Sequence, residues 1–266
     1  MENGFSVMHL MSPQPKTETY YLHSHEGYEF LLFLKGDSEY IVEGKTYKLE
    51  VGDAIISRRG EMHRIVHLSN SFYERIVINI FPEFFDINNC REYEKIFTDK
   101  SFLKNNKITA KIINESGIKS AAERLVNYSE NGKRAEKPVV RAALTEFLYL
   151  LNNVKTFDKS DNLNPLVQNI ISYINEHFCE NVDLNNLASM FFVSKYYLCH
   201  LFKTATGHTI HSYINEKRLS ALKDLCKRGI SIGKAAALCG FSDYSSFYRF
   251  YVKKYGVSPK KDLKSG

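Results

Sequence analysis

The sequence predicts an α+β chain of two domains, an antiparallel β-sandwich or barrel followed by an all-α domain. Three observations support this fold class. Short apolar runs separated by turn residues fill residues 20–82, helical periodicity replaces them from about residue 88, and the net positive charge lies in the last hundred residues. With 266 residues, the chain is long enough for two ordinary hydrophobic cores.

The N-terminal strands are indicated by apolar runs that recur at regular spacing. Gly-containing turns lie between these runs, and Glu43-Gly44 is a suitable pair for a tight hairpin. Regular short strands of this kind are typical of antiparallel sandwiches and barrels. The runs occupy residues 30–34, 40–42, 54–56 and 76–80.

A helical segment follows at about residues 88–156. One amphipathic helix is predicted near 115–131 and ends at Asn131-Gly132, and Pro138 begins a second near 138–152. The second helix carries an apolar stripe of Leu144, Leu148 and Leu151. The stripe could cover the sheet or pair with a second subunit, and we predict a homodimer through these helices.

A polar, turn-rich stretch at 157–164 predicts a linker, so the domains are expected at 1–160 and 161–266. Residues 1–160 carry equal numbers of acidic and basic side chains, whereas residues 161–266 carry 14 Lys and Arg against 8 Asp and Glu. The whole net charge of +6 therefore belongs to the second domain, as expected for a part that binds a polyanion.

The C-terminal domain is predicted to be entirely helical, with Asn164 capping a first helix that begins at Pro165. Further helices are expected at 184–190, 195–204, 210–227, 232–238 and 244–254. Their N-caps are expected at Asp183, Ser194, Thr209, Ser231 and Asp243, and left-handed glycines are expected after them at Gly207, Gly229, Gly240 and Gly256.

Within this domain, an offset of 49 residues brings two similar segments into register. The matched positions are Leu198 with Phe247, Leu201-Phe202 with Phe250-Tyr251, and Gly207 with Gly256. In each copy a short helix, a turn and a second capped helix follow one another, which is the order of a helix-turn-helix. The outward positions of the second helices are the candidate DNA-binding residues: Lys195, Tyr196, Cys199, His200 and Lys203 in the first copy, and Tyr244, Ser245, Tyr248, Arg249 and Lys253 in the second.

The same region resembles the DNA-binding domain of the AraC/XylS family over roughly residues 165–261. The first half carries Val193-Ser194, Tyr197-Leu198, Leu201-Phe202-Lys203, Tyr213-Ile214 and Arg218-Leu219, and the second half carries Gly240-Phe241-Ser242-Asp243 and Gly256-Val257-Ser258-Pro259. The resemblance implies two helix-turn-helix units joined by a helix at 210–227, each inserting one helix into the major groove. The departures from the pattern are Phe192, where a small residue is usual, Val252 for Lys, Leu222 for Ala and His200 for Arg.

The N-terminal domain resembles a cupin barrel through His23-Ser24-His25, Glu29, Gly36, Gly52-Asp53, Gly60 and His63. His23, His25, Glu29 and His63 match the donors of a cupin metal site, a set suited to a divalent transition metal. Sensor domains of AraC-type regulators commonly keep this pattern without metal, so neither a metal nor another cofactor is expected. The predicted effector-binding residues are His23, His25, Tyr28, Glu29, Arg58 and His63.

The predicted function is a sequence-specific transcription regulator that binds double-stranded DNA and is not an enzyme. The family resemblance implies activation, RNA polymerase as a partner and a small effector of the sugar type. Two alternatives stay open: a metal-dependent cupin enzyme with a helical appendage, and a DNA-binding dimer that needs no effector. Five cysteines without a CxxC pair and the absence of a long apolar segment favour a cytoplasmic protein without a membrane span.

Overall fold

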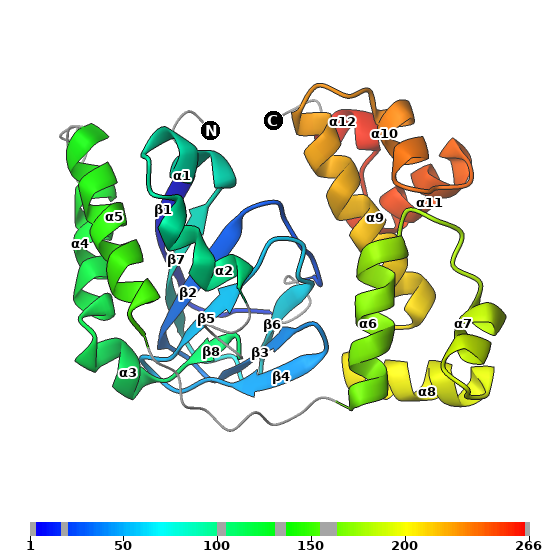
Figure 1. The fold of residues 1–266 in the computed structure, drawn as a ribbon, viewed down its shortest axis with the longest axis horizontal. Helices are drawn as coiled ribbons and strands as arrows, with labels where there is room; N and C mark the ends of the chain where they lie inside the picture. The colour runs from blue at the N-terminus through cyan, green and yellow to red at the C-terminus, as the bar shows by residue number, and fades with distance from the viewer. Residues whose placement is uncertain (1–3, 17–20, 100–104, 131–136, 155–163, 264–266) are drawn as a thin grey trace. The chain divides into compact units, whose positions relative to one another are not determined.

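The computed structural model describes residues 4–16, 21–99, 105–130, 137–154 and 164–263 (Figure 1). The described chain forms two compact units. The N-terminal unit comprises residues 1–21, 27–42 and 46–161, and the C-terminal unit comprises residues 162–266 together with 22–26 and 43–45. The predicted linker at 157–164 lies outside the described residues except for Asn164.

The N-terminal unit contains two antiparallel sheets. The larger has the strand order β1 (Phe5–Ser12), β7 (Tyr73–Ile80), β2 (Tyr28–Lys35), β5 (Ala54–Ser57) and β8 (Lys107–Ile108). The smaller has the order β4 (Lys45–Lys48), β3 (Ser38–Val42) and β6 (His63–His67). Glu43 and Gly44 both have positive φ, 47° and 79°, as the predicted hairpin turn between β3 and β4 requires.

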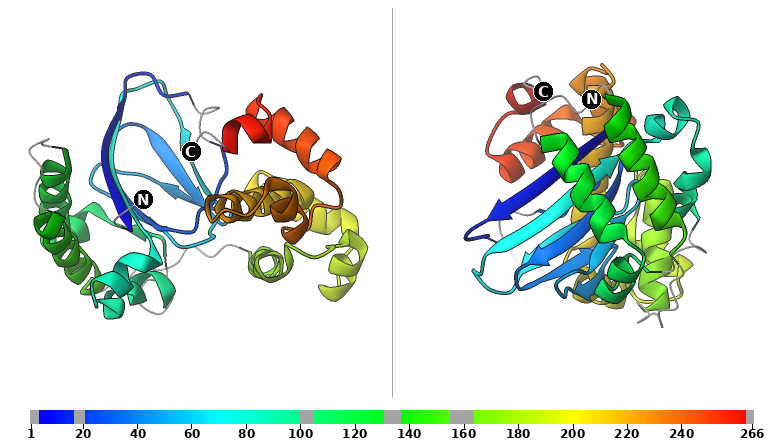
Figure 2. Two further views of the ribbon diagram at one scale, coloured as in Figure 1. Left: turned by 90° about the horizontal axis from the view of Figure 1, so that it is seen from above. Right: turned by 90° about the vertical axis from the view of Figure 1, so that its left-hand side faces the viewer.

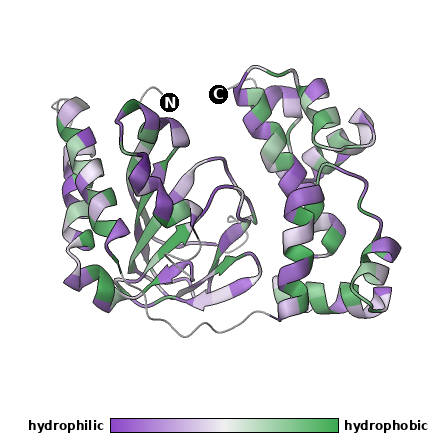
Figure 3. Cartoon of the chain, viewed as in Figure 1, coloured by the Kyte–Doolittle hydropathy of each residue, from purple (hydrophilic) through white to green (hydrophobic). Residues whose placement is uncertain are grey.

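The larger sheet packs against the smaller sheet on one face and against helices on the other. Successive side chains of a strand point to opposite sides, so β2 contributes residues to both cores. Leu31 and Phe33 of β2 point toward the smaller sheet, where they pack in one core with Tyr40 and Ile65. Phe30 and its neighbours on the other face pack against helices. Figure 2 shows these helices along one face of the sheet, and Figure 3 shows apolar residues concentrated on the strands.

The helices on this outer face are α1 (Pro82–Ile87), η2 (Arg91–Glu94), α2 (Lys95–Thr98), α3 (Ala110–Glu115), α4 (Ile118–Glu130) and α5 (Lys137–Asn152). The predicted helix end at Asn131-Gly132 lies outside the described residues.

The stripe of Leu144, Leu148 and Leu151 is fully buried in the core that includes Phe30 and the helices. The prediction that this stripe forms a dimer interface is therefore wrong, because its apolar surface already covers the chain's own sheet. The spacing of three and four residues fits both arrangements equally, so periodicity could not distinguish them.

The C-terminal unit is helical. Its helices are α6 (Pro165–His177), α7 (Leu184–Met190), α8 (Lys195–Thr206), α9 (Ile210–Lys227), α10 (Ile232–Leu238), α11 (Tyr244–Tyr255) and α12 (Pro259–Leu263). The predicted helix starts are confirmed because each N-cap lies where its residue type indicates. Side chains of Asn164, Asp183, Ser194, Thr209 and Asp243 accept backbone N–H bonds, whereas the N-cap Ser231 makes no side-chain cap bond.

Among the described residues, no helix has the length and apolar character needed to span a membrane.

Candidate functional site

The first helix-turn-helix consists of α7 and α8. The Ser194 hydroxyl accepts a hydrogen bond from the backbone N–H of Tyr197 at 3.2 Å, which begins α8 after the turn. Leu198 and Phe202 are fully buried, and the Phe202 ring packs edge-on against Tyr213 of α9 with centroids 5.4 Å apart. These contacts orient α8 so that the opposite face is open to solvent.

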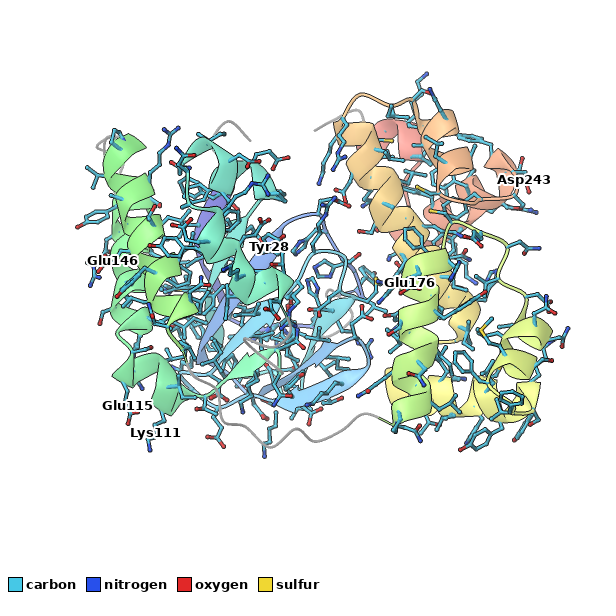
Figure 4. All side chains as sticks on the ribbon, viewed as in Figure 1. Tyr28, Lys111, Glu115, Glu146, Glu176 and Asp243 are labelled. Carbon is cyan, nitrogen blue, oxygen red and sulfur yellow. The ribbon has the colours of Figure 1, made fainter. Side chains whose placement is uncertain are left out.

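The second helix-turn-helix consists of α10 and α11. The Asp243 carboxylate accepts bonds from the backbone N–H of Ser246 and from its hydroxyl, both at 2.7 Å (Figure 4). These bonds hold the pKa of Asp243 below its ordinary value, because they stabilise the ionised form. Phe247 and Tyr251 are fully buried, and the Tyr251 hydroxyl donates to Asp262 of α12.

All but one of the ten candidate DNA-binding residues are exposed, and Cys199 is half-buried. The rings of Tyr196 and His200, one helical turn apart on α8, are stacked parallel within 2°, with centroids 6.1 Å apart. Arg249 is exposed on α11 and its guanidinium lies 3.5 Å from the Ser246 hydroxyl. Both helices therefore present long hydrogen-bond donors to solvent.

Arg218 of α9 has a structural role that the sequence did not indicate. Its guanidinium donates to the carbonyl oxygens of Phe178 at 2.6 Å and Glu180 at 2.7 Å. It thereby fixes the segment that follows α6 against the joining helix. Burial lowers the pKa of Arg218, and the two carbonyl oxygens offset part of the cost of burying its guanidinium.

In the N-terminal unit, three polar side chains meet in the core between the sheets. The Tyr40 hydroxyl donates to the Glu29 carboxylate at 2.9 Å, and His63 Nε2 lies 3.9 Å from the same oxygen of Glu29. His63 Nδ1–H donates to the Glu61 carbonyl at 2.8 Å. Burial, with Glu29 next in effect, raises the pKa of Tyr40 well above its ordinary value.

Two of the four predicted metal donors, Glu29 and His63, lie in the N-terminal unit, where His63 Nε2 is 3.9 Å from a Glu29 carboxylate oxygen. His23 and His25 belong to residues 22–26, which group with the C-terminal unit. An imidazole and a carboxylate are donors that suit a divalent transition metal, and they equally offer polar groups to a small molecule.

Arg58 belongs to a second polar group next to Ser57. Its guanidinium donates to Glu61 at 3.2 Å, and Asn106 donates to the Glu61 carboxylate at 2.7 Å and to the Ile56 carbonyl at 2.8 Å. Sequence reasoning missed Tyr40, Glu61 and Asn106. Nothing in a single sequence pairs an isolated tyrosine with a carboxylate on a different strand.

Tyr28 lies on the other face of β2 from Glu29. Its ring stacks on Phe97 of α2 with centroids 4.6 Å apart, and its hydroxyl donates to Glu94 at 2.9 Å (Figure 4). Burial, followed by the bond to Glu94, raises the pKa of Tyr28. The structure therefore brings Glu29 and His63 together and leaves Tyr28 with the helices.

Comparison with protein families gives two matches. A model described as a helix-turn-helix domain matches residues 187–265, and a model described as a cupin domain matches residues 9–77. The order of the two domains is thus a cupin followed by a helix-turn-helix.

Curated relatives match along nearly the whole chain. The probable transcriptional regulator LumQ of Photobacterium leiognathi is 26% identical over 251 residues, covering 92% of each chain. The chain belongs to the AraC/XylS family. The HTH-type transcriptional activator RhaS of Citrobacter koseri is 21% identical over 251 residues, covering 92% of this chain and 87% of that protein. This AraC-type protein is therefore a DNA-binding transcription regulator.

Solved structures similar to this AraC-type regulator include ToxT from Vibrio cholerae, with 15% identity, a TM-score of 0.43 and 98% of each chain covered. A protein of unknown function from Listeria innocua is 31% identical, with a TM-score of 0.36, over 38% of this chain and 97% of that chain.

Proposed function

We propose that this regulator is an activator controlled by a small polar effector that binds Glu29, His63 and Arg58, with His23 and His25. One observation carries the proposal: ionisable side chains lie in the core of the barrel, where burying apolar side chains would cost less free energy of folding. Glu29 is 9% exposed, His63 0% and Arg58 7%. Replacing buried ionic groups with apolar ones is often neutral or stabilising, so their presence favours a binding role. Together they can hold hydroxyl or carboxylate groups by charge-assisted hydrogen bonds.

The test compares two buried histidines on the same face of β6. His63 lies near Glu29, whereas His67 bonds the Ser38 hydroxyl at 2.9 Å, four residues further along the strand. At about 3.3 Å per residue, these positions are roughly 13 Å apart. The variants His63→Gln and His67→Gln therefore change the same residue type in the same strand, and only the first touches the proposed site.

The measurement is the melting temperature of the full chain with a panel of pentoses, hexoses and hydroxy acids, combined with native mass spectrometry of the purified chain. A true effector at about 100 times its dissociation constant adds about 2.7 kcal/mol of stability. We expect this gain to disappear in His63→Gln and to persist in His67→Gln. The proposal would be contradicted if both variants lost the effector-induced gain in stability equally, or if no compound gave a response in either assay.

A metal-dependent activity is the second candidate, because His23, His25, Glu29 and His63 match the donor set of a cupin metal site in the sequence. A bound divalent metal would supply Lewis-acid chemistry, and Glu29 would complete its ligand set. Elemental analysis of the full chain separates the two candidates. Stoichiometric iron, manganese or zinc that is lost in the double variant His25→Ala/His63→Ala would favour the metal site over the effector site.

We also propose that the outward faces of α8 and α11 contact DNA through the ten residues predicted from the sequence, and that the chain acts as a homodimer with RNA polymerase as its partner. The exposure of these faces and the activator relatives support this.

Sedimentation of the full chain with and without DNA tests the dimer. A Leu148→Glu variant is expected to unfold, because Leu148 is core.

A further inference from the structure

The turn of the first helix-turn-helix exposes an aromatic side chain in a strained conformation. Phe192 has φ +55°, in the left-handed region that costs a non-glycine residue free energy, and its side chain is 96% exposed. Single exposed apolar residues are common on protein surfaces and need no explanation. Here a strained backbone coincides with a large ring that gains nothing from burial, so neither local geometry nor packing favours phenylalanine.

The second helix-turn-helix provides an internal reference for this position. Gly240 follows α10 as Phe192 follows α7, and it has φ +84°. The hydrogen bonds match. The N–H of Phe192 bonds the Ser189 carbonyl and the next N–H bonds Ala188, while the N–H of Gly240 bonds Ala237 and the next N–H bonds Ala236. The turn itself therefore requires only a residue that tolerates a left-handed conformation, which glycine does best.

The surroundings of the two positions differ. A Cβ on Gly240 would lie 2.1 Å from the Cys179 carbonyl oxygen, so that turn is covered by the segment after α6. The side chain of Phe192 instead projects into solvent two residues before the N-cap of α8. In a helix-turn-helix, the N-terminal end of the second helix approaches the base edges. Tyr196, one turn further, is 81% exposed, and Lys195 beside it is exposed as well.

We infer that Phe192 is a specificity-determining residue that packs on the C5 methyl group of a thymine in the major groove. Thymine is the base that presents an apolar group in this groove, and phenylalanine is among the side chains that contact it. Lys195 next to the cap supplies positive charge toward the phosphates, so the surroundings of Phe192 suit DNA. The inference rests on the proposal that α8 contacts DNA.

The test uses the full chain and a duplex obtained by binding-site selection with the unmodified protein. Each thymine of the selected duplex is replaced in turn by uracil, which removes only the methyl group. Loss of one buried methyl group corresponds to about a fourfold loss of affinity. We expect one position to show this loss with the unmodified protein and no loss with Phe192→Gly. Phe192→Gly should also bind the thymine duplex about fourfold more weakly and melt a few degrees higher, because glycine relieves the strain.

Two control variants keep the outcomes distinct. Leu238→Ala removes an apolar side chain that is 54% exposed at the end of α10, and it should show no thymine-dependent change. Lys203→Ala tests whether α8 contacts DNA at all.

If Lys203→Ala weakens DNA binding, and Phe192→Gly loses as much DNA affinity on uracil duplexes as on thymine duplexes, the inference is overturned. An unchanged DNA affinity with reduced transcription in Phe192→Gly also overturns it and indicates a protein partner. If neither variant changes binding, the proposed α8 interface fails and the inference fails with it.

Discussion

The two helix-turn-helix units share one backbone plan but carry different side chains at equivalent places. Both second helices begin at a side-chain cap and end at a left-handed glycine, Gly207 with φ +76° and Gly256 with φ +70°. The buried positions also correspond, Leu198 to Phe247 and Phe202 to Tyr251. The shared features are those that a helix-turn-helix needs in order to fold.

The differences lie on the surface and in the turns. When α8 and α11 are aligned on their caps, His200 corresponds to Arg249, Tyr196 to Ser245 and Lys203 to Val252. The second turn is also one residue longer, since the caps are 49 residues apart and the left-handed turn residues are 48 apart. Duplicated units can thus keep one core while the residues that would meet DNA diverge.

The largest expected effect concerns the covered turn. Gly240→Ala adds a Cβ into the Cys179 carbonyl oxygen at a left-handed position. A left-handed non-glycine residue costs about 1–2 kcal/mol and overpacking about 1–3 kcal/mol, so we expect roughly 3 kcal/mol of destabilisation. Hydrogen exchange of the full chain, followed peptide by peptide, reports the C-terminal helices separately from the barrel.

Gly256→Ala is the matched control, because Gly256 also has positive φ but a Cβ added there would meet nothing within 4 Å. It should lose only about 1 kcal/mol from the strained backbone. Equal losses for both variants would show that the segment after α6 does not restrict the second turn in solution.

The next effect concerns which residues of α11 contact bases and which contact phosphates. Arg249→Ala should relax the preference at one or two adjacent base pairs by about 1–3 kcal/mol, since a guanidinium can bond a guanine at both O6 and N7. Lys253→Ala should weaken binding to all sequences alike and reduce the salt slope by about one unit. Binding-site selection on both variants provides the measurement. If both keep the parental preference and lose affinity equally, Arg249 is another phosphate contact.

The sequence predicted the helical domain better than the barrel, for a physical reason. Caps and C-terminal glycines act within a few residues, so Asp183, Ser194 and Gly207 mark their helix ends wherever the domain packs. Contacts between distant segments have no such local sign. The approach of Cys179 to Gly240 and the bond from Tyr40 to Glu29 join residues far apart in the chain.

The two faces of β2 show this limit most clearly. Residues Tyr28 to Phe33 are all buried, so no alternation of polar and apolar residues distinguishes the barrel side from the helix side. Neighbouring residues of a strand nevertheless point to opposite faces, so the predicted effector site should not have combined Tyr28 with Glu29, and Tyr28 points to the helices. The edge strand β1 was missed because it is only partly buried and precedes the region where apolar runs are regular.

A smaller effect is expected at the caps. Ser194→Ala removes the hydroxyl that accepts the Tyr197 N–H and should destabilise the first helix-turn-helix by about 1 kcal/mol. Ser231→Ala is the control, since the Ser231 side chain makes no cap bond in the structure. Urea denaturation monitored by hydrogen exchange in α8 and α10 measures both. If Ser231→Ala lowers the free energy of unfolding as much as Ser194→Ala does, both serines cap their helices in solution.

The smallest effect is a pH dependence confined to the second helix-turn-helix. Ser194 does not titrate, whereas Asp243 caps α11 as a carboxylate whose pKa lies below its ordinary value of 3.8. A lowered pKa in the folded state means that the carboxylate contributes stability above about pH 3.8 and loses it as the pH falls through the folded pKa. The stability of α11 should therefore decline more than that of α8 between about pH 5 and about pH 3, a range that spans the ordinary Asp pKa.

The variant Asp243→Ser isolates this contribution, because it supplies the neutral cap that α8 already uses. Its hydroxyl can still accept the Ser246 N–H, so the helix start is kept while the titrating group is removed. The stability difference between Asp243→Ser and the unmodified chain should shrink as the pH falls, as measured by urea denaturation across that range. A difference that stays constant would show that the Asp243 carboxylate stabilises the cap no better when ionised than when protonated, and the two caps would then be equivalent in electrostatics as well as in geometry.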